Sequence, residues 1–244
     1  MRDFRVVTVL VISALTLSGC ARKSASTNVS KGSGFGSALV EVSGGKQATT
    51  VGMRLAQPVV VQVNDDQGNG VSGAFVSFRG SNGSTFDPVS GVTDSSGQFT
   101  TNPSLGGMAG RYQFTATTFG KSGKAIELNV EEVALGYEGT LGREISEKYC
   151  ARCHDSESTP ERVSNYDNLA VKPHAFSDGA TLNPISDADL MAIINHGGAA
   201  LNRSPLMPPY EYTLSKSDIH ALLAYIRTIA DPPYRAAGTF YAKE

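Results

Sequence analysis

Hydrophobic positions in the first half of the chain recur with a period of two. Apolar side chains occupy every second position in residues 59–63, 74–78 and 112–116. Turn-forming runs rich in Gly, Asn, Asp and Ser lie between them, at residues 65–70, 80–83 and 95–97. Short alternating segments with regular turns are typical of half-buried strands, so we predict an antiparallel β-sandwich over residues 37–133.

The spacing of the hydrophobic positions changes after residue 133. Leu141, Ile145 and Tyr149 lie four residues apart, as on one face of a helix. A helical domain is therefore expected over residues 134–234, followed by a C-terminal tail at residues 235–244. The chain is predicted to be multidomain, with an all-β unit before an all-α unit.

Two further helices carry start signals. Ser186 precedes an apolar run and has Asp189 three residues later, the spacing of a capping box. Either Ser215 or Ser217 opens the last helix, which ends where an Asp-Pro-Pro sequence removes backbone donors. No element is predicted for residues 155–184, where neither period is present.

Composition agrees with folded domains. Apolar residues make up 40% of the 244-residue chain and charged residues only 18%. That balance excludes a chain that is disordered throughout. The formal net charge of −2 gives no reason to expect nucleic acid as a partner.

The predicted sandwich resembles bacterial Ig-like domains of the invasin and adhesin type. The resemblance lies in residues 58–78, 92–99 and 109–117 and extends over about 95 residues. It implies the fold and identifies no ligand. The segment contains no Cys, so an inter-sheet disulfide cannot form and packing must supply its stability.

The N-terminus has the layout of an export signal. Arg2 and Arg5 frame a positive start before the apolar run of residues 6–17, which is too short to span a bilayer. The run ends in Leu-Ser-Gly followed by Cys20. This sequence resembles the bacterial lipobox, which implies that a signal peptide, residues 1–19, is removed and that Cys20 is lipidated. The alternative is a plain signal peptide with an incidental cysteine.

A flexible tether is expected between this anchor and the sandwich. Residues 20–36 are rich in Ser, Gly, Ala and Lys and show no periodicity. In the lipoprotein class that the motif resembles, Asp after the lipidated cysteine retains the protein in the inner membrane, whereas this chain has Ala21 there. The resemblance therefore implies a lipid anchor in the outer membrane of the cell envelope, facing either the periplasm or the cell surface.

Cys150, Cys153 and His154 form a C-x-x-C-H motif, the attachment sequence of c-type haem. Two thiols one helical turn apart can bond to the two vinyl groups on one edge of a porphyrin, and the adjacent imidazole then reaches the iron from the same side. The motif predicts one covalently attached haem c. The same residues could instead serve a structural zinc site, a thioredoxin-like redox pair or a structural disulfide.

The surroundings of this motif resemble small class I cytochromes c, from about Gly139 to Pro232. Gly142 and Ile145 match the N-terminal helix of that family, and residues 222–226 match its C-terminal helix. The resemblance implies an all-α cytochrome c domain.

By the same resemblance, His154 is the proximal iron ligand and Met207 the distal one. Pro205, Pro208 and Pro209 flank Met207 and stiffen its loop. The plain alternative is a methionine of a surface loop or of the core. Weaker candidates for the distal position are His174, His196 and His220.

Two positions depart from the family pattern. Ser146 stands where many members carry an aromatic side chain. The segment after His154 lacks the usual small-residue and proline pattern, and Pro160 is the candidate for the turn whose carbonyl orients the proximal imidazole in the family.

These features together predict an exported, lipid-anchored electron-transfer protein with one His/Met-ligated haem, and not an enzyme. Its expected partners are a redox donor protein, a redox acceptor protein and the membrane. The sandwich is expected to be a spacer that does not influence the haem. Two alternatives stay open: a surface- or polysaccharide-binding Ig-like module with an accessory cytochrome, and a haem enzyme or gas binder if Met207 does not bind iron.

Overall fold

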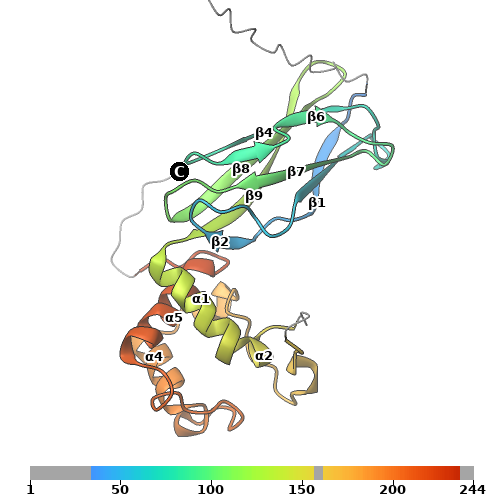
Figure 1. Ribbon diagram of the computed structural model, residues 1–244. Helices are drawn as coiled ribbons and strands as arrows, with labels where there is room; N and C mark the ends of the chain where they lie inside the picture. The colour runs from blue at the N-terminus through green and yellow to red at the C-terminus, as the bar shows by residue number, and fades with distance from the viewer. Residues whose placement is uncertain (1–33, 157–161, 237–244) are drawn as a thin grey trace, which may run out of the picture.

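The computed structural model describes residues 34–156 and 162–236. Figure 1 shows two units, a β-sandwich formed by the first part of the chain and a helical unit formed by the second. Cys20, Pro160 and the whole signal segment lie outside the described residues. No helix in the described ranges has the length and apolar character needed to cross a membrane.

Nine strands of the described residues build the sandwich: β1 (Ala38–Ser43), β2 (Ala48–Thr50), β3 (Val59–Asn64), β4 (Phe75–Gly80), β5 (Thr85–Asp87), β6 (Ser90–Val92), β7 (Gln98–Ser104), β8 (Gly110–Phe119) and β9 (Ala125–Leu135). One sheet has the order β1-β3-β7-β5 and the other the order β2-β9-β8-β4-β6. Neighbouring strands are antiparallel, except that β2 runs parallel to β9. The predicted two-sheet sandwich is confirmed.

The period-two pattern of the sequence locates the core of the sandwich. Val59, Val61 and Val63 of β3 are fully buried, while the positions between them are half-buried. Phe86 packs on two rings of the same core, with centroid distances of 5.5 Å to Phe78 and 4.9 Å to Phe114. Burying each large apolar side chain contributes about 1.5–3 kcal/mol, which stabilises the sandwich without a disulfide.

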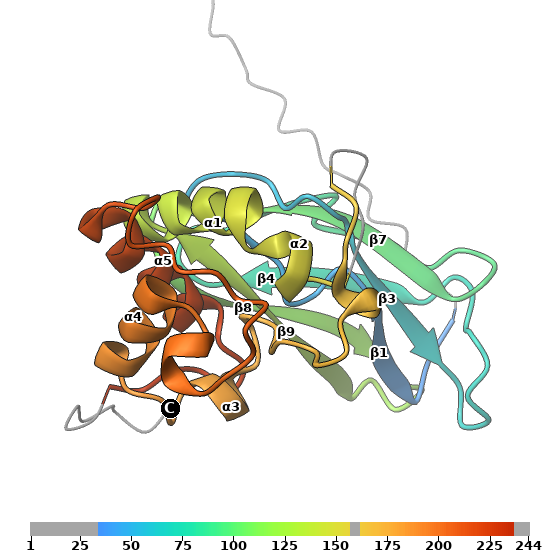
Figure 2. The ribbon, with the colours of Figure 1, turned by 90° about the horizontal axis from the view of Figure 1, so that it is seen from below.

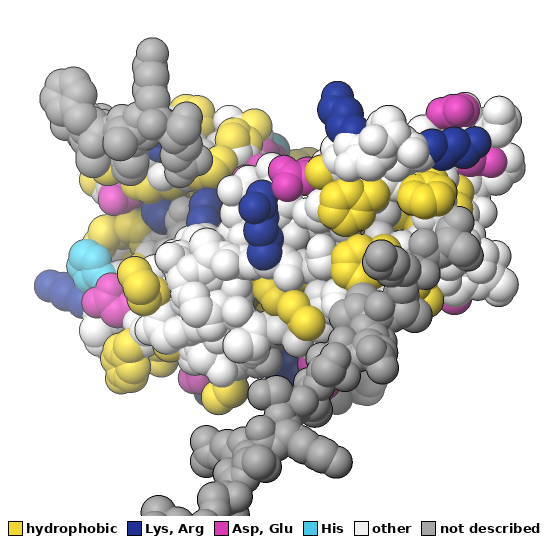
Figure 3. Space-filling view, turned by 90° about the horizontal axis from the view of Figure 1, so that it is seen from above, with side chains coloured by type: hydrophobic (Ala, Val, Ile, Leu, Met, Phe, Trp, Pro, Cys, Tyr) yellow, Lys and Arg dark blue, Asp and Glu magenta, His cyan; other side chains and the backbone are white. Residues whose placement is uncertain are grey.

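The outer surface of the sandwich is mixed in character. On the face seen from above in Figure 3, hydrophobic, basic and acidic side chains are interspersed over the described residues. Exposed apolar side chains such as Val42 and Val89 are normal at protein surfaces when they occur singly. The interspersed charges agree with the small net charge of the chain.

Strand β9 leads directly into the helical unit. It ends at Leu135, and Gly136 alone separates it from helix α1 (Tyr137–Tyr149). Ala134 and Leu135 are fully buried and pair with β2. Their burial extends the sandwich two residues beyond the boundary at residue 133 that the sequence pattern predicted.

The helical unit consists of α1, α2 (Ala151–His154), α3 (Gly179–Leu182), α4 (Asp187–His196) and α5 (Lys216–Ile229), with 3-10 turns η1 (Tyr166–Asn168) and η2 (Ala199–Leu201). Figure 2, seen from below, shows these helices gathered over one end of the sandwich. The main contact within the unit is between α1 and α5, and α4 packs on α5. The segment for which no element was predicted contains η1 and α3, which are too short to leave a periodic pattern.

The cap residues explain where two helices begin. Ser186 is the N-cap of α4, and its hydroxyl accepts the backbone N–H of Asp189 at 3.1 Å. Ser215 opens α5 with a full capping box, in which the Asp218 carboxylate accepts the N–H of Ser215 at 2.9 Å. Of the two candidates for the last helix, Ser215 is therefore correct, and each cap contributes about 1 kcal/mol.

One carboxyl group is buried inside the sandwich. Glu132 of β9 is fully buried; its Oε2 accepts the backbone N–H of Gln47 at 2.7 Å, while Oε1 has no partner among the described residues. Burial raises the pKa of Glu132 to about 8, although the bond from Gln47 opposes this shift. The side chain is therefore mostly neutral at pH 7 in the folded protein.

We expect Glu132→Gln to remove a pH dependence of stability. In the unfolded chain the carboxyl has its ordinary pKa of 4.5, so the folded state holds one more proton between that pH and about pH 8. The contribution of this proton to the free energy of unfolding is complete below this pH window. Within the window the contribution falls as the pH rises, by about 1.4 kcal/mol per pH unit. Urea-unfolding midpoints followed by circular dichroism measure the slope, with Glu127→Gln on the exposed side of β9 as the matched control. A slope that persists in Glu132→Gln contradicts the assignment.

Candidate functional site

The C-x-x-C-H motif lies where α1 ends and the short helix α2 begins. Cys150 is the residue between the two helices, and its N–H donates to the carbonyl of Ser146 at 2.8 Å. The N–H of His154 donates to the carbonyl of Cys150 at 3.0 Å, so the motif is wound into a single turn. The turn places Cys150, Cys153 and His154 together, as their spacing predicted.

Both thiols of the motif are free. Cys150 is buried in the core of the helical unit, whereas Cys153 is half-buried. Burial raises the pKa of Cys150 to about 12, with a smaller contribution from Cys153. A redox-active C-x-x-C pair has a lowered thiol pKa, so this environment disfavours the thioredoxin-like alternative.

The imidazole of His154 is oriented by residues from a distant part of the chain. Its Nδ1 lies 2.8 Å from the carbonyl oxygen of His174, and because a carbonyl only accepts, Nδ1 carries the hydrogen. The ring of Phe176 packs against the imidazole with a centroid distance of 4.7 Å. Burial lowers the pKa of His154, against a smaller rise from the His174 bond, and this shift favours the neutral ring. Nε2 is then the atom with a lone pair for a metal.

This arrangement differs from the expectation for the proximal side. The sequence pattern indicated Pro160 as the turn that orients the imidazole, and Pro160 lies outside the described residues. The structure assigns that part to the carbonyl of His174, 20 residues after His154. The ring of His174, a weaker candidate for the distal position, is exposed, and its Nδ1 lies 3.1 Å from a carboxylate oxygen of Asp178.

Sequence reasoning also missed a group of polar residues that brace the motif. Arg162 donates to the carbonyl of Ala151 at 3.0 Å and forms an ion pair with Asp155 at 2.7 Å. Ser164 donates through its hydroxyl to the carbonyl of Asp155 at 2.6 Å. These contacts hold residues 162–164 against α2 and the residue that follows it. They come from a segment without periodicity, so no pattern indicated them.

Met207 lies in the loop between η2 and α5. Its side chain is half-buried and packs against the hydrophobic core that contains Cys150. Its carbonyl accepts the N–H of Gly198 at 3.0 Å. A Cβ on Gly197, whose φ is +74°, would lie 2.7 Å from that carbonyl oxygen. The two glycines therefore allow the Met207 loop to lie against the end of α4.

Tyr210 joins the Met207 loop to the cysteine motif. Its hydroxyl donates to the carbonyl of Tyr149 at 2.9 Å, and the two rings meet edge to face at 6.3 Å. Burial raises the pKa of Tyr210 to about 12, and the nearby Cys150 and Cys153 add to the shift. The structure thus brings the loop of Met207 to the helix end that carries the cysteines. The sequence pattern did not predict a role for Tyr210 in the site. The only feature that could have indicated it is an aromatic side chain directly after two prolines.

The other three histidines, the weaker candidates for the distal position, are engaged or exposed elsewhere in the helical unit. Nδ1 of His196 lies 3.2 Å from a carboxylate oxygen of Glu211. His220 lies on the exposed side of α5. His174 contributes its carbonyl to His154, as described above. Met207 therefore stays the leading candidate for the distal position.

A close crossing of α1 and α5 supports the site. A Cβ on Gly142 would lie 2.0 Å from the carbonyl oxygen of Ala221 and 2.7 Å from Cβ of Tyr225. Only glycine fits at this contact, which explains its match to the N-terminal helix pattern. Ser146, the departure from that pattern, is buried one turn further along α1.

Comparison with protein families identifies the helical unit. Residues 138–226 match the family described as cytochrome c oxidase, cbb3-type, subunit III. The helical unit is a cytochrome c domain. A cytochrome c domain binds haem and indicates haem-based electron transfer. No curated protein sequence matches the chain.

Solved structures similar to the chain include three with the names intimin, InvE and invasin. The D0-D1 domain of intimin is 16% identical with a TM-score of 0.31, covering 41% of this chain and 49% of that one. The adhesin InvE of Yersinia pseudotuberculosis is 17% identical with a TM-score of 0.32, covering 40% and 32%. Invasin, a bacterial integrin-binding protein, is 20% identical with a TM-score of 0.31, covering 40% and 19%. The chain spans about half or less of the length of each of these structures.

The residues of the cytochrome domain fit a haem. Two free thiols stand one turn apart, and the neutral imidazole of His154 has its Nδ1 engaged by His174, which leaves Nε2 for iron. Phe176 supplies an apolar wall beside the imidazole. This donor set is the one that c-type haem requires on its proximal side.

Proposed function

We propose that the protein is an exported, lipid-anchored cytochrome with one covalent haem c, which carries single electrons between a donor and an acceptor protein. The observation that carries this proposal is the C-x-x-C-H turn, in which His154 is neutral and presents Nε2. The match of residues 138–226 to a cytochrome family supports it.

Each site residue has a role in this proposal. Cys150 and Cys153 would hold the haem through thioether bonds, and His154 and Met207 would bind its iron. When bound, the haem supplies one-electron chemistry by alternating between Fe(III) and Fe(II). A thioether ligand favours the reduced state, and the Gly197–Gly198 contact with the backbone of Met207 supports the loop that carries this side chain. With His154 and Met207 both bound to the iron, these residues would leave no site there for oxygen or peroxide.

A redox titration of the purified protein tests this function. We expect one reversible one-electron wave and a weak absorbance band at the red end of the visible spectrum in the oxidised protein, the band typical of Met–iron(III) ligation. Rapid binding of carbon monoxide by the reduced protein, without that band, would instead indicate an open-site enzyme or gas binder.

We also propose that Cys20 anchors the protein in the outer membrane of the cell envelope. The lipobox-like sequence before Cys20 and the Ala21 that follows support this placement. Two or more acyl chains anchor a protein stably, whereas one binds only marginally. We expect the wild-type protein to require detergent for extraction and Cys20→Ser to be released or to keep its signal segment. Wild-type protein found wholly in the detergent-free fraction contradicts the anchor.

A further inference from the structure

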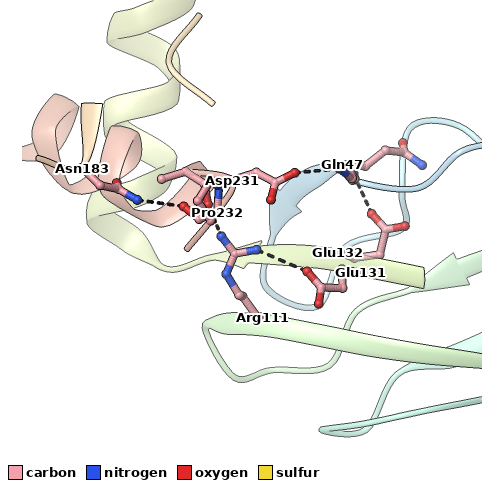
Figure 4. Close-up of polar contacts among 9 residues, drawn as sticks. Gln47, Arg111, Glu131, Glu132, Asn183, Asp231 and Pro232 are labelled. Atoms are coloured by element: carbon pink, nitrogen blue, oxygen red, sulfur yellow. Dashed lines mark hydrogen bonds and ion pairs between the residues drawn. The ribbon is translucent and has the colours of Figure 1, made fainter. Parts of the chain in front are cut away.

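Two basic side chains of the sandwich hold the segment that follows α5. Nζ of Lys46 lies 2.6 Å from a carboxylate oxygen of Asp231, and the Arg111 guanidinium donates to the carbonyl of Ala230 (Figure 4). Ala230 is fully buried, and Arg111 is also paired with Glu131 at 3.7 Å. The Lys46 pair is exposed to water and contributes little. Arg111 is the stronger restraint, because without it a buried carbonyl loses its donor.

The same segment is bonded to the chain that leads into α3. The N–H of Asp231 donates to the carbonyl of Ser177 at 2.8 Å, and the carbonyl of Asp231 accepts the N–H of Gly179 at 3.0 Å. The Asn183 side chain donates to the carbonyl of Pro232 at 2.8 Å (Figure 4). A Cβ on Gly179 would lie 2.2 Å from that Pro232 oxygen, so the two segments are in close contact.

The chain that leads into α3 is also the one that orients His154. It supplies the carbonyl of His174 at 2.8 Å from Nδ1 and the ring of Phe176 at 4.7 Å from the imidazole. The turn is closed by the bond from the N–H of Asp178 to the carbonyl of Ala175 at 3.0 Å, and Nδ1 of His174 lies 3.1 Å from the Asp178 carboxylate. A displacement of this turn therefore moves both groups that fix the imidazole.

We propose that Arg111 and Lys46 of the sandwich are positioning residues for the proximal haem ligand. The sandwich holds residues 230–232, and residues 230–232 hold residues 174–179. Residues 174–179 in turn fix the imidazole of His154. The inference rests on the proposed function in one respect, that His154 binds the haem iron. The sandwich is then a structural part of the haem site and not a detached spacer.

The direction of the effect follows from the hydrogen bond at Nδ1. A bond from Nδ1–H to a carbonyl raises the basicity of an imidazole ligand, which favours Fe(III) and lowers the reduction potential. We expect Arg111→Ala to loosen this bond and to raise the reduction potential. The oxidised-to-reduced equilibrium should shift by up to about tenfold, which corresponds to about 59 mV for one electron. Lys46→Ala should shift it in the same direction by less, because its ion pair is exposed.

Arg79→Ala is the matched control. Arg79 forms an ion pair with Glu127 at 3.1 Å on the same sandwich, and among the described residues no hydrogen bond or ion pair joins these two side chains to residues 230–232. We expect its potential to equal that of the wild type. The companion measurement is hydrogen exchange of the Gly179 and Asp231 amides, which should be faster in Arg111→Ala and unchanged in Arg79→Ala.

The outcomes separate the two proposals. A raised potential together with faster exchange in Arg111→Ala supports the coupling, whereas an unchanged potential with intact covalent haem overturns it. If Arg111→Ala does not fold, Arg111→Lys and Lys46→Ala decide the same question. Wild-type protein without covalent haem defeats the proposed function, and the coupling is then judged by the Nδ1–H proton signal of His154, which should exchange faster in Lys46→Ala or Arg111→Lys than in Arg79→Ala.

Discussion

Replacing both cysteines of the motif by alanine is expected to abolish covalent haem attachment. Wild-type protein should keep its haem on a denaturing gel and stain for it, because thioether bonds survive unfolding. Cys150→Ala with Cys153→Ala removes both sulfur atoms, so the denatured chain should carry no haem at all. Either single variant leaves one thiol and should retain haem at reduced yield.

The matched control for this experiment is Arg152→Ala. Arg152 lies between the two cysteines and its side chain is exposed, so the change preserves the C-x-x-C-H pattern and its turn. Its haem stain should equal that of the wild type. Wild-type protein that loses all haem on denaturation, with Cys150 and Cys153 recovered as thiols or as a disulfide, refutes covalent attachment.

Met207→Ala is expected to change the electronic state of the iron strongly. Apart from substitutions of His154 and of the two cysteines, it should have the largest effect. Loss of the thioether removes the sulfur–iron band and the ligand that favours Fe(II). The reduction potential should fall by on the order of 0.1 V or more, within the roughly 0.8 V range that axial ligands span. The freed position should then bind carbon monoxide in the reduced protein.

Met191→Ala serves as the control for loss of packing. Met191 lies on α4 and, like Met207, is partly buried against the core of the cytochrome domain. Its removal should lower thermal stability and leave both the sulfur–iron band and the potential unchanged. If Met207→Ala also leaves them unchanged, Met207 is not the ligand, and His174 and His196 become the candidates for the distal position.

The parts of the fold that were predictable are those whose signal is local. The alternation of buried and half-buried positions in β3 depends only on the period of a strand. The N-caps Ser186 and Ser215 act on backbone groups within three residues. The three residues of the C-x-x-C-H motif meet in one helical turn. In each case the interacting groups are close in the chain, so their spacing is visible in the sequence.

The contacts that orient the imidazole of His154 were not visible in this way. The acceptor for Nδ1 of His154 is a backbone carbonyl 20 residues away. Every residue has a carbonyl, so no residue type marks the one that is used. Arg162 likewise binds a carbonyl and a carboxylate, and the sequence around it has no periodicity.

The sequence by itself determined that a two-sheet unit is followed by a helical unit with a C-x-x-C-H turn, because period and motif spacing are properties of short segments. Only the tertiary structure decided how the two units are joined. Gly136 is the single residue between β9 and α1, and the Arg111 contact to Ala230 joins positions 119 residues apart. Such a contact depends on where two folded units place a side chain and a buried carbonyl, and long-range placement of this kind leaves no periodic trace in the chain.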